Sequence, residues 1–356
     1  MVDVDPCAVE GVLSAEGLDA ICFIHPPNLR HQCGFTGTDG ALVVASDRSW
    51  FLTDSRYTVQ AQAQVTSASV IEYRQKVSGI CKLLTQQGLR RVGFEAAQLT
   101  VAELRQFERN ADQVEWVPLE KQIAGLRGIK AEVERLSLKR AADISAEAFR
   151  EILPLIKPGC SEAALAMELE FALRRLGGEE KAFDFIVASG LRGALPHGVA
   201  SDKLLASGEL VTIDFGTRFR GYHSDETVTL ALGHVSSELR CIYDTVLEAH
   251  DRAIDAVRPG VPLKDVDAIA RNLICERGFG DYFGHGLGHG VGLEIHEFPV
   301  VSPRSESRAC EGMVFTIEPG IYIPELGGCR IEDMIMVTVD GCEVLTSIPK
   351  QFQTIN

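Results

Sequence analysis

The sequence has no excess of positive charge, no long hydrophobic run and no cysteine motif, and each absence excludes a class of protein. Its 356 residues carry 35 basic and 50 acidic side chains, a formal net charge of −15, so we expect no nucleic-acid or anionic-membrane partner. No apolar run approaches the roughly 18 residues that a membrane-spanning helix needs. The first ten residues contain three acids and no base, which is unlike a secretory signal, and we expect a cytoplasmic protein.

The ten cysteines are scattered, with no CxxC pair and no histidines at zinc-finger spacing. We interpret them as reduced thiols, most of them in the hydrophobic core. Cys160 and Cys329 are the alternatives as a reactive nucleophile, but neither lies in a motif that supports this role.

The length and the globular composition predict two domains, and the hydrophobic pattern changes near residue 125. Up to that point short apolar runs alternate with helical stretches, which is typical of a small α/β domain over residues 1–124. We expect its strands at 20–24, 41–45, 50–53 and 92–94, and a helix at 101–110.

Residues 125–356 contain a weak internal repeat. A long helix is predicted over 129–152; then Lys157-Pro158-Gly159 and an amphipathic helix lead to Gly177. The same order recurs from Arg258-Pro259-Gly260 to Gly278. The repeat predicts an α+β domain with a pseudo-twofold axis, its helices on one face of a mainly antiparallel sheet and a site on the axis. Chance similarity of two amphipathic helix pairs is the alternative.

Four acids lie in or beside apolar strands of this second domain. We expect 211–216 and 224–230 to form a hairpin with Asp214 and Asp225 facing each other. Glu318 ends an apolar run, and residues 329–337 are expected to form one strand with Glu332 and Arg330 on the same face. An acid at a strand end is commonly just solvated, but acids inside strands this apolar are costly unless they are paired or bind metal.

Three histidines accompany a glycine-rich segment. His285 and His289 lie in the run 284–292, and His296 follows shortly after. The glycines let the backbone approach a crowded centre closely. The run fits GxGxxG in no frame, so a dinucleotide site is not indicated. This clustering favours a site over three unrelated structural histidines.

Four carboxylates and one imidazole are a ligand set for two divalent ions. Such ligands suit Mn²⁺, Co²⁺ or Fe²⁺, with Zn²⁺ possible, and the absence of thiolates disfavours a closed structural zinc site. Two such ions can polarise a carbonyl and supply an activated water, which is the chemistry of amide hydrolysis.

The motifs IDFG, YHSDETVT, GHGLGHGVGLEIHE, FTIEPGIYIP and GGCRIED carry these residues in order. In this the chain resembles the pita-bread metallopeptidases, most closely the Xaa-Pro dipeptidases (prolidases) and Xaa-Pro aminopeptidases. The resemblance covers residues 125–356 and extends more weakly to the N-terminal domain through GFTGTDG and TDSRYT. It implies a C-terminal pita-bread (creatinase/aminopeptidase) domain, a smaller creatinase-like N-terminal domain and a homodimer.

The resemblance also implies a role for each matching residue. Asp214 would chelate one ion, Asp225 and Glu332 would bridge the pair, and His289 and Glu318 would bind the second ion. Glu318 would also act as general base and pass the proton to the prolyl nitrogen, while His296 would stabilise the oxyanion. The substrate would contact His197, His285, His296 and Arg330, with Arg330 orienting Glu332 or the end of the substrate. The alternative for each outer residue is that it only braces a ligand.

The predicted activity is hydrolysis of the bond before proline in small peptides with proline at the second position, most closely that of an Xaa-Pro dipeptidase. An Xaa-Pro aminopeptidase acting on longer peptides is the alternative, since the two differ in whether the far side of the site is open. Methionine aminopeptidases share the five ligands but fit the SDET and IEPGIYIP contexts less well. A non-catalytic peptide-binding module on the same fold is the remote alternative.

Overall fold

The computed structural model describes residues 6–355, and the chain divides into two compact units, residues 1–127 and 128–356. Each unit has its own hydrophobic core. Among the described helices, none combines the length and the hydropathy that crossing a membrane requires.

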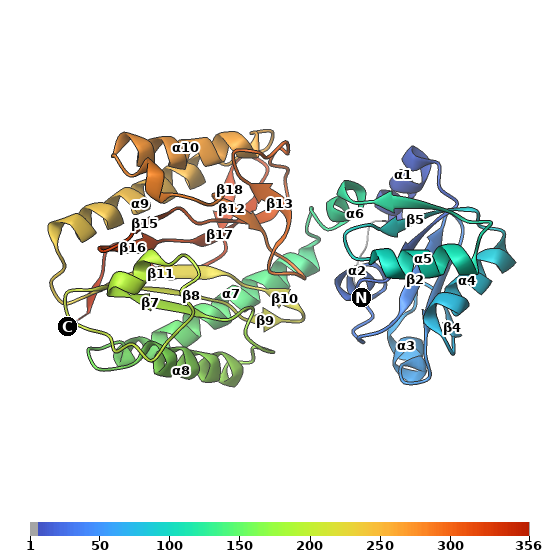
Figure 1. The fold of residues 1–356 in the computed structure, drawn as a ribbon, viewed down its shortest axis with the longest axis horizontal. Helices are drawn as coiled ribbons and strands as arrows, with labels where there is room; N and C mark the ends of the chain where they lie inside the picture. The colour runs from blue at the N-terminus through green and yellow to red at the C-terminus, as the bar shows by residue number, and fades with distance from the viewer. Residues whose placement is uncertain (1–5, 356) are drawn as a thin grey trace. The chain divides into compact units, whose positions relative to one another are not determined.

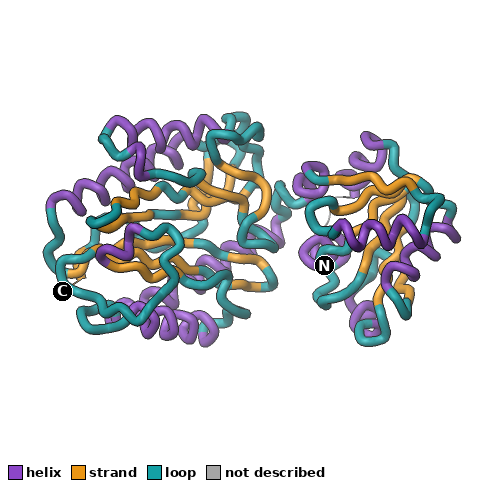
Figure 2. Tube along the Cα trace, viewed as in Figure 1, coloured by secondary structure: helices purple, strands orange, loops and turns teal. Residues whose placement is uncertain are grey.

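A six-stranded mixed sheet forms the centre of the first unit, in the order β4-β3-β2-β1-β5-β6 (Figure 1; Figure 2). Side chains alternate along β1, so Ala20 and Cys22 join one buried cluster while Ile21 and Phe23 join another on the opposite face. Helices cover both faces, which gives the α/β layering expected from the sequence. The elements are α1 (Pro6–Glu16), β1 (Ala20–Phe23), α2 (Pro26–Cys33), β2 (Ala41–Ala45), β3 (Ser49–Thr53), α3 (Thr58–Gln64), β4 (Ser69–Glu72), α4 (Lys76–Gln87), β5 (Arg91–Glu95), α5 (Val101–Asn110), β6 (Glu115–Leu119) and α6 (Lys121–Leu126).

The first half of the second unit packs two helices on a four-stranded sheet of order β19-β11-β8-β7. Leu165 and Leu169 of the second helix lie in one core with Val211 and Ile213 of the sheet. The elements are α7 (Glu132–Ile152), α8 (Glu162–Arg175), β7 (Ile186–Ser189), β8 (Leu210–Phe215), β9 (Arg218–Phe219), β10 (Tyr222–His223), β11 (Glu226–Leu232) and β19 (Thr354–Ile355).

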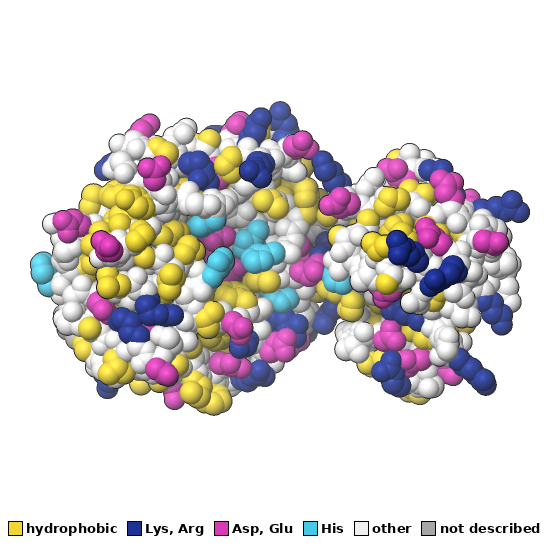
Figure 3. Space-filling view, in the orientation of Figure 1, with side chains coloured by type: hydrophobic (Ala, Val, Ile, Leu, Met, Phe, Trp, Pro, Cys, Tyr) yellow, Lys and Arg dark blue, Asp and Glu magenta, His cyan; other side chains and the backbone are white. Residues whose placement is uncertain are grey.

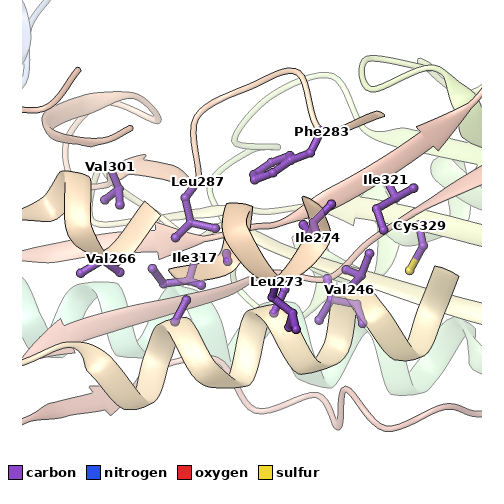
Figure 4. Packing of buried hydrophobic residues seen from close by; sticks show 14 of the residues in the cluster. Val246, Val266, Leu273, Ile274, Phe283, Leu287, Val301, Ile317, Ile321 and Cys329 are labelled. Atoms are coloured by element: carbon purple, nitrogen blue, oxygen red, sulfur yellow. The ribbon is translucent and has the colours of Figure 1, made fainter. Parts of the chain in front are cut away.

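The second half repeats this plan with a five-stranded sheet of order β13-β12-β14-β17-β18. In Figure 4, Val246, Leu273 and Ile274 of its helices pack against Ile317 and Ile321 from the strand region. The elements are α9 (Ser237–Ala256), α10 (Leu263–Glu276), β12 (Gly288–Gly290), β13 (Glu297–Val301), β14 (Val314–Ile317), β15 (Gly320–Ile323), β16 (Gly327–Arg330), β17 (Asp333–Val337) and β18 (Cys342–Val344). The two helix pairs cover opposite ends of this unit (Figure 1), which confirms the predicted repeat. The single sheet expected is instead two sheets, one in each half.

A backbone bridge joins the two halves of this unit. Thr227 of β11 and Glu332 form an isolated antiparallel bridge, in which the Glu332 amide donates to the Thr227 carbonyl at 3.2 Å. Because Asp225 lies just before β11, this bridge brings acids of both halves together. The pseudo-axis is therefore where functional groups converge.

Two sequence-based expectations need correction. Residues 329–337 do not form one strand, because β16 pairs with β15 and β17 pairs with β14, and the chain changes sheets at Ile331 and Glu332. The cysteines are free, but only four of the nine described ones are buried: Cys22, Cys33, Cys81 and Cys329. Exposed cysteines on helices and loops account for the difference, because a thiol tolerates either environment.

Candidate metal centre

One cavity of about 460 Å³ collects every site residue predicted from the sequence. In Figure 3, histidine and acidic side chains gather in a hollow on the face of the larger unit. The predicted residues in its lining are His197, Asp214, Asp225, His285, His289, His296, Glu318, Arg330 and Glu332.

The two aspartates enter the cavity from neighbouring strands but are not directly opposite each other. In the β8–β11 ladder, Asp214 pairs with Thr227 and Phe215 with Glu226. Asp225 lies one residue before β11, beyond the end of the ladder. Both residues are buried, with 8% of the surface of the whole residue exposed for Asp214 and 4% for Asp225. The expected hairpin is present, but its register is offset.

His289 reaches the acids because the strand that carries it packs closely against its neighbours. A Cβ atom on Gly288 would overlap the Thr316 carbonyl oxygen, and one on Gly290 would overlap the carbonyl of Phe298. The His289 Nε2 atom lies 3.5 Å from Asp225 Oδ2 and 3.4 Å from Glu318 Oε1. Glycine is required on both sides of this histidine because backbone occupies the space of a side chain.

The remaining carboxylate ligands are held by hydroxyl and guanidinium donors. Thr227 donates its hydroxyl to Glu332 Oε2 at 2.6 Å. Arg330 Nη2 donates to Asp214 Oδ2 at 2.6 Å, and Arg330 Nε donates to the Thr227 hydroxyl at 3.3 Å. The expectation that Arg330 orients Glu332 is therefore corrected, since its carboxylate partner is Asp214.

Burial and neighbouring like charges strongly raise the pKa values of the acids in the cavity. Burial, reinforced by the Glu332 and Asp214 charges, raises the pKa of Asp225 well above its usual range. Burial and the Glu318 charge do the same for the pKa of Glu332. Burial raises the pKa of Glu318 to about 8, and burial with the neighbouring His296 lowers the pKa of His289 to about 3. His289 is thus neutral near pH 7, as metal coordination requires.

This donor set fits divalent ions. Asp225, His289 and Glu332 each offer a ligand atom within 4.8 Å of the others. Asp214 Oδ1 is buried and has no hydrogen-bond partner among the described residues, so it is an oxygen donor available to an ion. Several buried carboxylates with one neutral imidazole are stable together when cations neutralise them, and oxygen-rich sets of this kind suit Mn²⁺, Co²⁺ or Fe²⁺.

The outer histidines lie around this cluster. The rings of His289 and His296 meet edge to face, with centroids 4.0 Å apart. His285 Nε2 lies 3.0 Å from the Tyr322 hydroxyl, which accepts a bond from Arg330 Nη1 at 2.9 Å. Arg330 Nη1 also donates at 3.0 Å to the Pro196 carbonyl, beside His197, whose exposed side chain lines the cavity.

Sequence reasoning missed Thr227 and Tyr322, which touch the site residues directly. Both lie inside the motifs YHSDETVT and FTIEPGIYIP, but a hydroxyl in a strand has no signal of its own in one sequence. The position of each beside an acid or a histidine depends on how the sheets meet.

Comparison with known proteins identifies this arrangement. A family model described as Metallopeptidase family M24 matches residues 137–339, and one described as Creatinase/Prolidase N-terminal domain matches residues 8–129. The chain belongs to metallopeptidase family M24. The predicted family and two-domain fold are confirmed, and the chain is a metallo-exopeptidase of this family.

Several relatives align with nearly the whole chain. The chain is 37% identical to the Xaa-Pro dipeptidase of Pyrococcus horikoshii over 95% of both chains. The structure of an Xaa-Pro dipeptidase from Bacillus anthracis superposes with a TM-score of 0.95 at 41% identity, covering 98% of this chain and 99% of that one. An X-Pro aminopeptidase from Thermotoga maritima superposes with a TM-score of 0.89 at 34% identity, over 98% and 99%.

Proposed function

We propose that this chain is an Xaa-Pro dipeptidase that uses two divalent ions to hydrolyse the bond before proline. The observation that carries the proposal is the convergence of Asp214, Asp225, His289, Glu318 and Glu332 in one cavity, from both halves of the unit. Relatives named Xaa-Pro dipeptidase support the choice of substrate.

In this proposal Asp214 would hold one ion, Asp225 and Glu332 would hold both, and His289 and Glu318 would hold the second. Such ions supply Lewis acidity and an activated water. Arg330 fixes the Asp214 carboxylate through the 2.6 Å bond, and Thr227 fixes Glu332. These contacts leave each carboxylate one orientation, which favours a preorganised site.

Glu318 is the proposed general base. Its carboxylate is half-buried, lies 3.4 Å from His289 Nε2 and accepts a bond from the Thr316 hydroxyl at 3.3 Å. A carboxylate in this position can take a proton from water and return it to the prolyl nitrogen of the leaving group. Proline makes a tertiary amide, which explains a dedicated site for this bond.

The exposed His296 side chain is proposed to donate to the developing oxyanion, and His197 and His285 to line the proline side. Burial lowers the pKa of His285 to about 4, so it is neutral near pH 7 and fixed by the Tyr322 hydroxyl. A neutral imidazole beside apolar Phe183, Ile186 and Val199 suits a proline ring better than a charged one.

The proposal extends to Mn²⁺ or Co²⁺ as the ions, to a homodimer and to the cytoplasm. The oxygen-rich ligand set supports the choice of metal, and the acidic composition supports a non-membrane protein. Small peptides remain the proposed partners.

The decisive experiment compares hydrolysis of Ala-Pro and Ala-Pro-Ala by the Mn²⁺-loaded protein, with Met-Ala-Ser as control. Cleavage of the dipeptide alone is the expected result. Efficient cleavage of Ala-Pro-Ala would instead identify an Xaa-Pro aminopeptidase, for which the Thermotoga maritima likeness is the supporting observation. Metal binding without cleavage of any peptide would favour a binding module.

A further inference from the structure

A buried lysine lies behind the metal centre and contacts two acids at once. Lys350 Nζ lies 2.6 Å from Glu226 Oε1 and 3.2 Å from Asp333 Oδ1. All three side chains are buried, with exposed fractions of 6%, 0% and 8% in that order. Taking charges out of water is costly, and here the ammonium lies between two acids that compensate its charge.

Each of these acids is the sequence neighbour of a proposed metal ligand. Glu226 follows Asp225, and Asp333 follows Glu332. Successive residues of an extended chain face opposite sides, so Asp225 and Glu332 line the cavity while their neighbours do not. Lys350 therefore links the first residues of β11 and β17 on the side that faces away from the cavity. Asp225 and Glu332, the two carboxylates proposed to hold both ions, directly precede these residues.

The segment that carries Lys350 is tied down at several points. The Ile348 amide donates to Glu226 Oε1 at 3.1 Å, and the Thr346 hydroxyl donates to Asp333 Oδ1 at 2.5 Å. The Tyr243 hydroxyl donates to the Lys350 carbonyl at 2.7 Å. The segment is thus anchored partly on the two acids themselves and partly, through Tyr243, at a point that involves neither of them.

We propose that Lys350 is a positioning residue of the metal centre, which sets the spacing of Asp225 and Glu332 by bridging Glu226 and Asp333. The inference rests on the proposed function, because it takes Asp225 and Glu332 to be ligands. It assigns a role at the site to residues 345–350, which no motif around the ligands includes.

The test separates positioning from general stability. The double variant E226Q/K350M removes one anion and one cation together, keeps an acceptor for the Ile348 amide, and leaves Asp333 bonded to Thr346. Replacing a buried ion pair by neutral groups is commonly tolerated in folding. We expect the dissociation constant for Mn²⁺, measured by titration calorimetry on the chelator-stripped protein, to rise about tenfold or more.

Tyr243→Phe is the matched control. It removes one anchor of the same segment and leaves the ammonium and both acids in place. We expect its Mn²⁺ dissociation constant to equal that of the unmodified protein, even where urea unfolding shows reduced stability. If E226Q/K350M does not fold, E226Q/K350Q gives the same comparison, because glutamine at position 350 retains a donor without the charge and Glu226 is again neutralised.

Unchanged Mn²⁺ affinity in folded E226Q/K350M or E226Q/K350Q would overturn the positioning role. Equal weakening in Tyr243→Phe would overturn it as well, since anchoring of the segment would then explain the effect. An unmodified protein that binds no Mn²⁺ and cleaves no Xaa-Pro peptide would instead contradict the proposed function. The two failures are therefore distinguishable.

Discussion

Arg330 donates a hydrogen bond to Asp214 across 2.6 Å, although the two residues lie in different halves of the catalytic unit. Both side chains are nearly inaccessible, at 4% and 11% exposure. The guanidinium compensates the negative charge of one acid of the cavity, whether or not ions are bound. It bonds to Asp214 Oδ2 and leaves Oδ1 without a partner among the residues described.

Arg330→Met should destabilise the metal-free protein by about 3 kcal/mol, because it leaves a buried carboxylate unpaired. Mn²⁺ should restore part of this loss, since an ion at Asp214 replaces the missing positive charge. Urea unfolding with and without Mn²⁺ measures both effects. An equal loss under the two conditions would argue against Asp214 as a ligand.

Thr227→Val should weaken Mn²⁺ binding about tenfold, because the Glu332 carboxylate loses the donor that orients it. The control is Thr212→Val on the adjacent strand, where the lost bond joins the hydroxyls of Thr212 and Thr229 at 3.0 Å. That control should bind Mn²⁺ normally. Similar affinities for the two variants would remove the role assigned to Thr227.

In the protein stripped of metal ions by a chelator, the free energy of unfolding should fall as pH rises from 6.5 to 8. The pKa of Glu318 is raised from 4.5 to about 8, so in that range the folded protein holds a proton that the unfolded chain has released. The pKa of His289 is lowered from 6.5 to about 3, which favours the folded state as pH rises, but only up to pH 6.5. The slope between pH 6.5 and 8 should approach about 1 kcal/mol per pH unit for each such acid.

Urea unfolding in EDTA at several pH values gives this slope directly. Glu318→Gln should reduce it, because the amide does not titrate, while Asp225 and Glu332 continue to contribute. Stability that stays level or increases over this range would show that the acids are not buried together in the metal-free protein.

Gly288→Ala should disrupt the strand of His289, since the new methyl group overlaps the Thr316 carbonyl oxygen. We expect a loss of about 2 kcal/mol or more in unfolding free energy, together with loss of bound Mn²⁺. Gly284→Ala, in the same motif, has no neighbour within 4 Å of the added Cβ and should fold and bind metal normally. Equal behaviour of the two variants would contradict the close packing of this strand.

Local signals account for much of the fold. The start of helix α5 was predictable because Thr100 and Glu103 form a capping box. The Glu103 amide donates to the Thr100 hydroxyl at 3.2 Å, and the Thr100 amide donates to the Glu103 carboxylate at 3.0 Å. The change of sheet at Ile331 was not predictable, because the apolar alternation continues through it. Only the choice of partner strand breaks the element there, and partner choice is a tertiary property.

The residues of the site also fall into some that the sequence predicts and some that it does not. Histidines among glycines and acids in apolar strands are unusual enough to be noticed in one sequence, so the ligand candidates could be predicted. The partners of these ligands could not be, because Arg330 and Lys350 reach their acids across long separations in the chain. A lysine beside a strand normally indicates a solvated surface, and only the packed structure shows that this one is buried.

The bridge between Thr227 and Glu332 also has a consequence for biosynthesis. During synthesis, Asp214 and Asp225 are added before the other three proposed ligands. Residues 237–276, which form α9 and α10, come next in the chain, and only then follow His289, Glu318 and Glu332. If the five residues are the ligands, the set is complete only after the two halves have docked, and metal loading should be a late event. A nascent or truncated chain that ends before Glu332 would contain some of the proposed ligands but not the complete set.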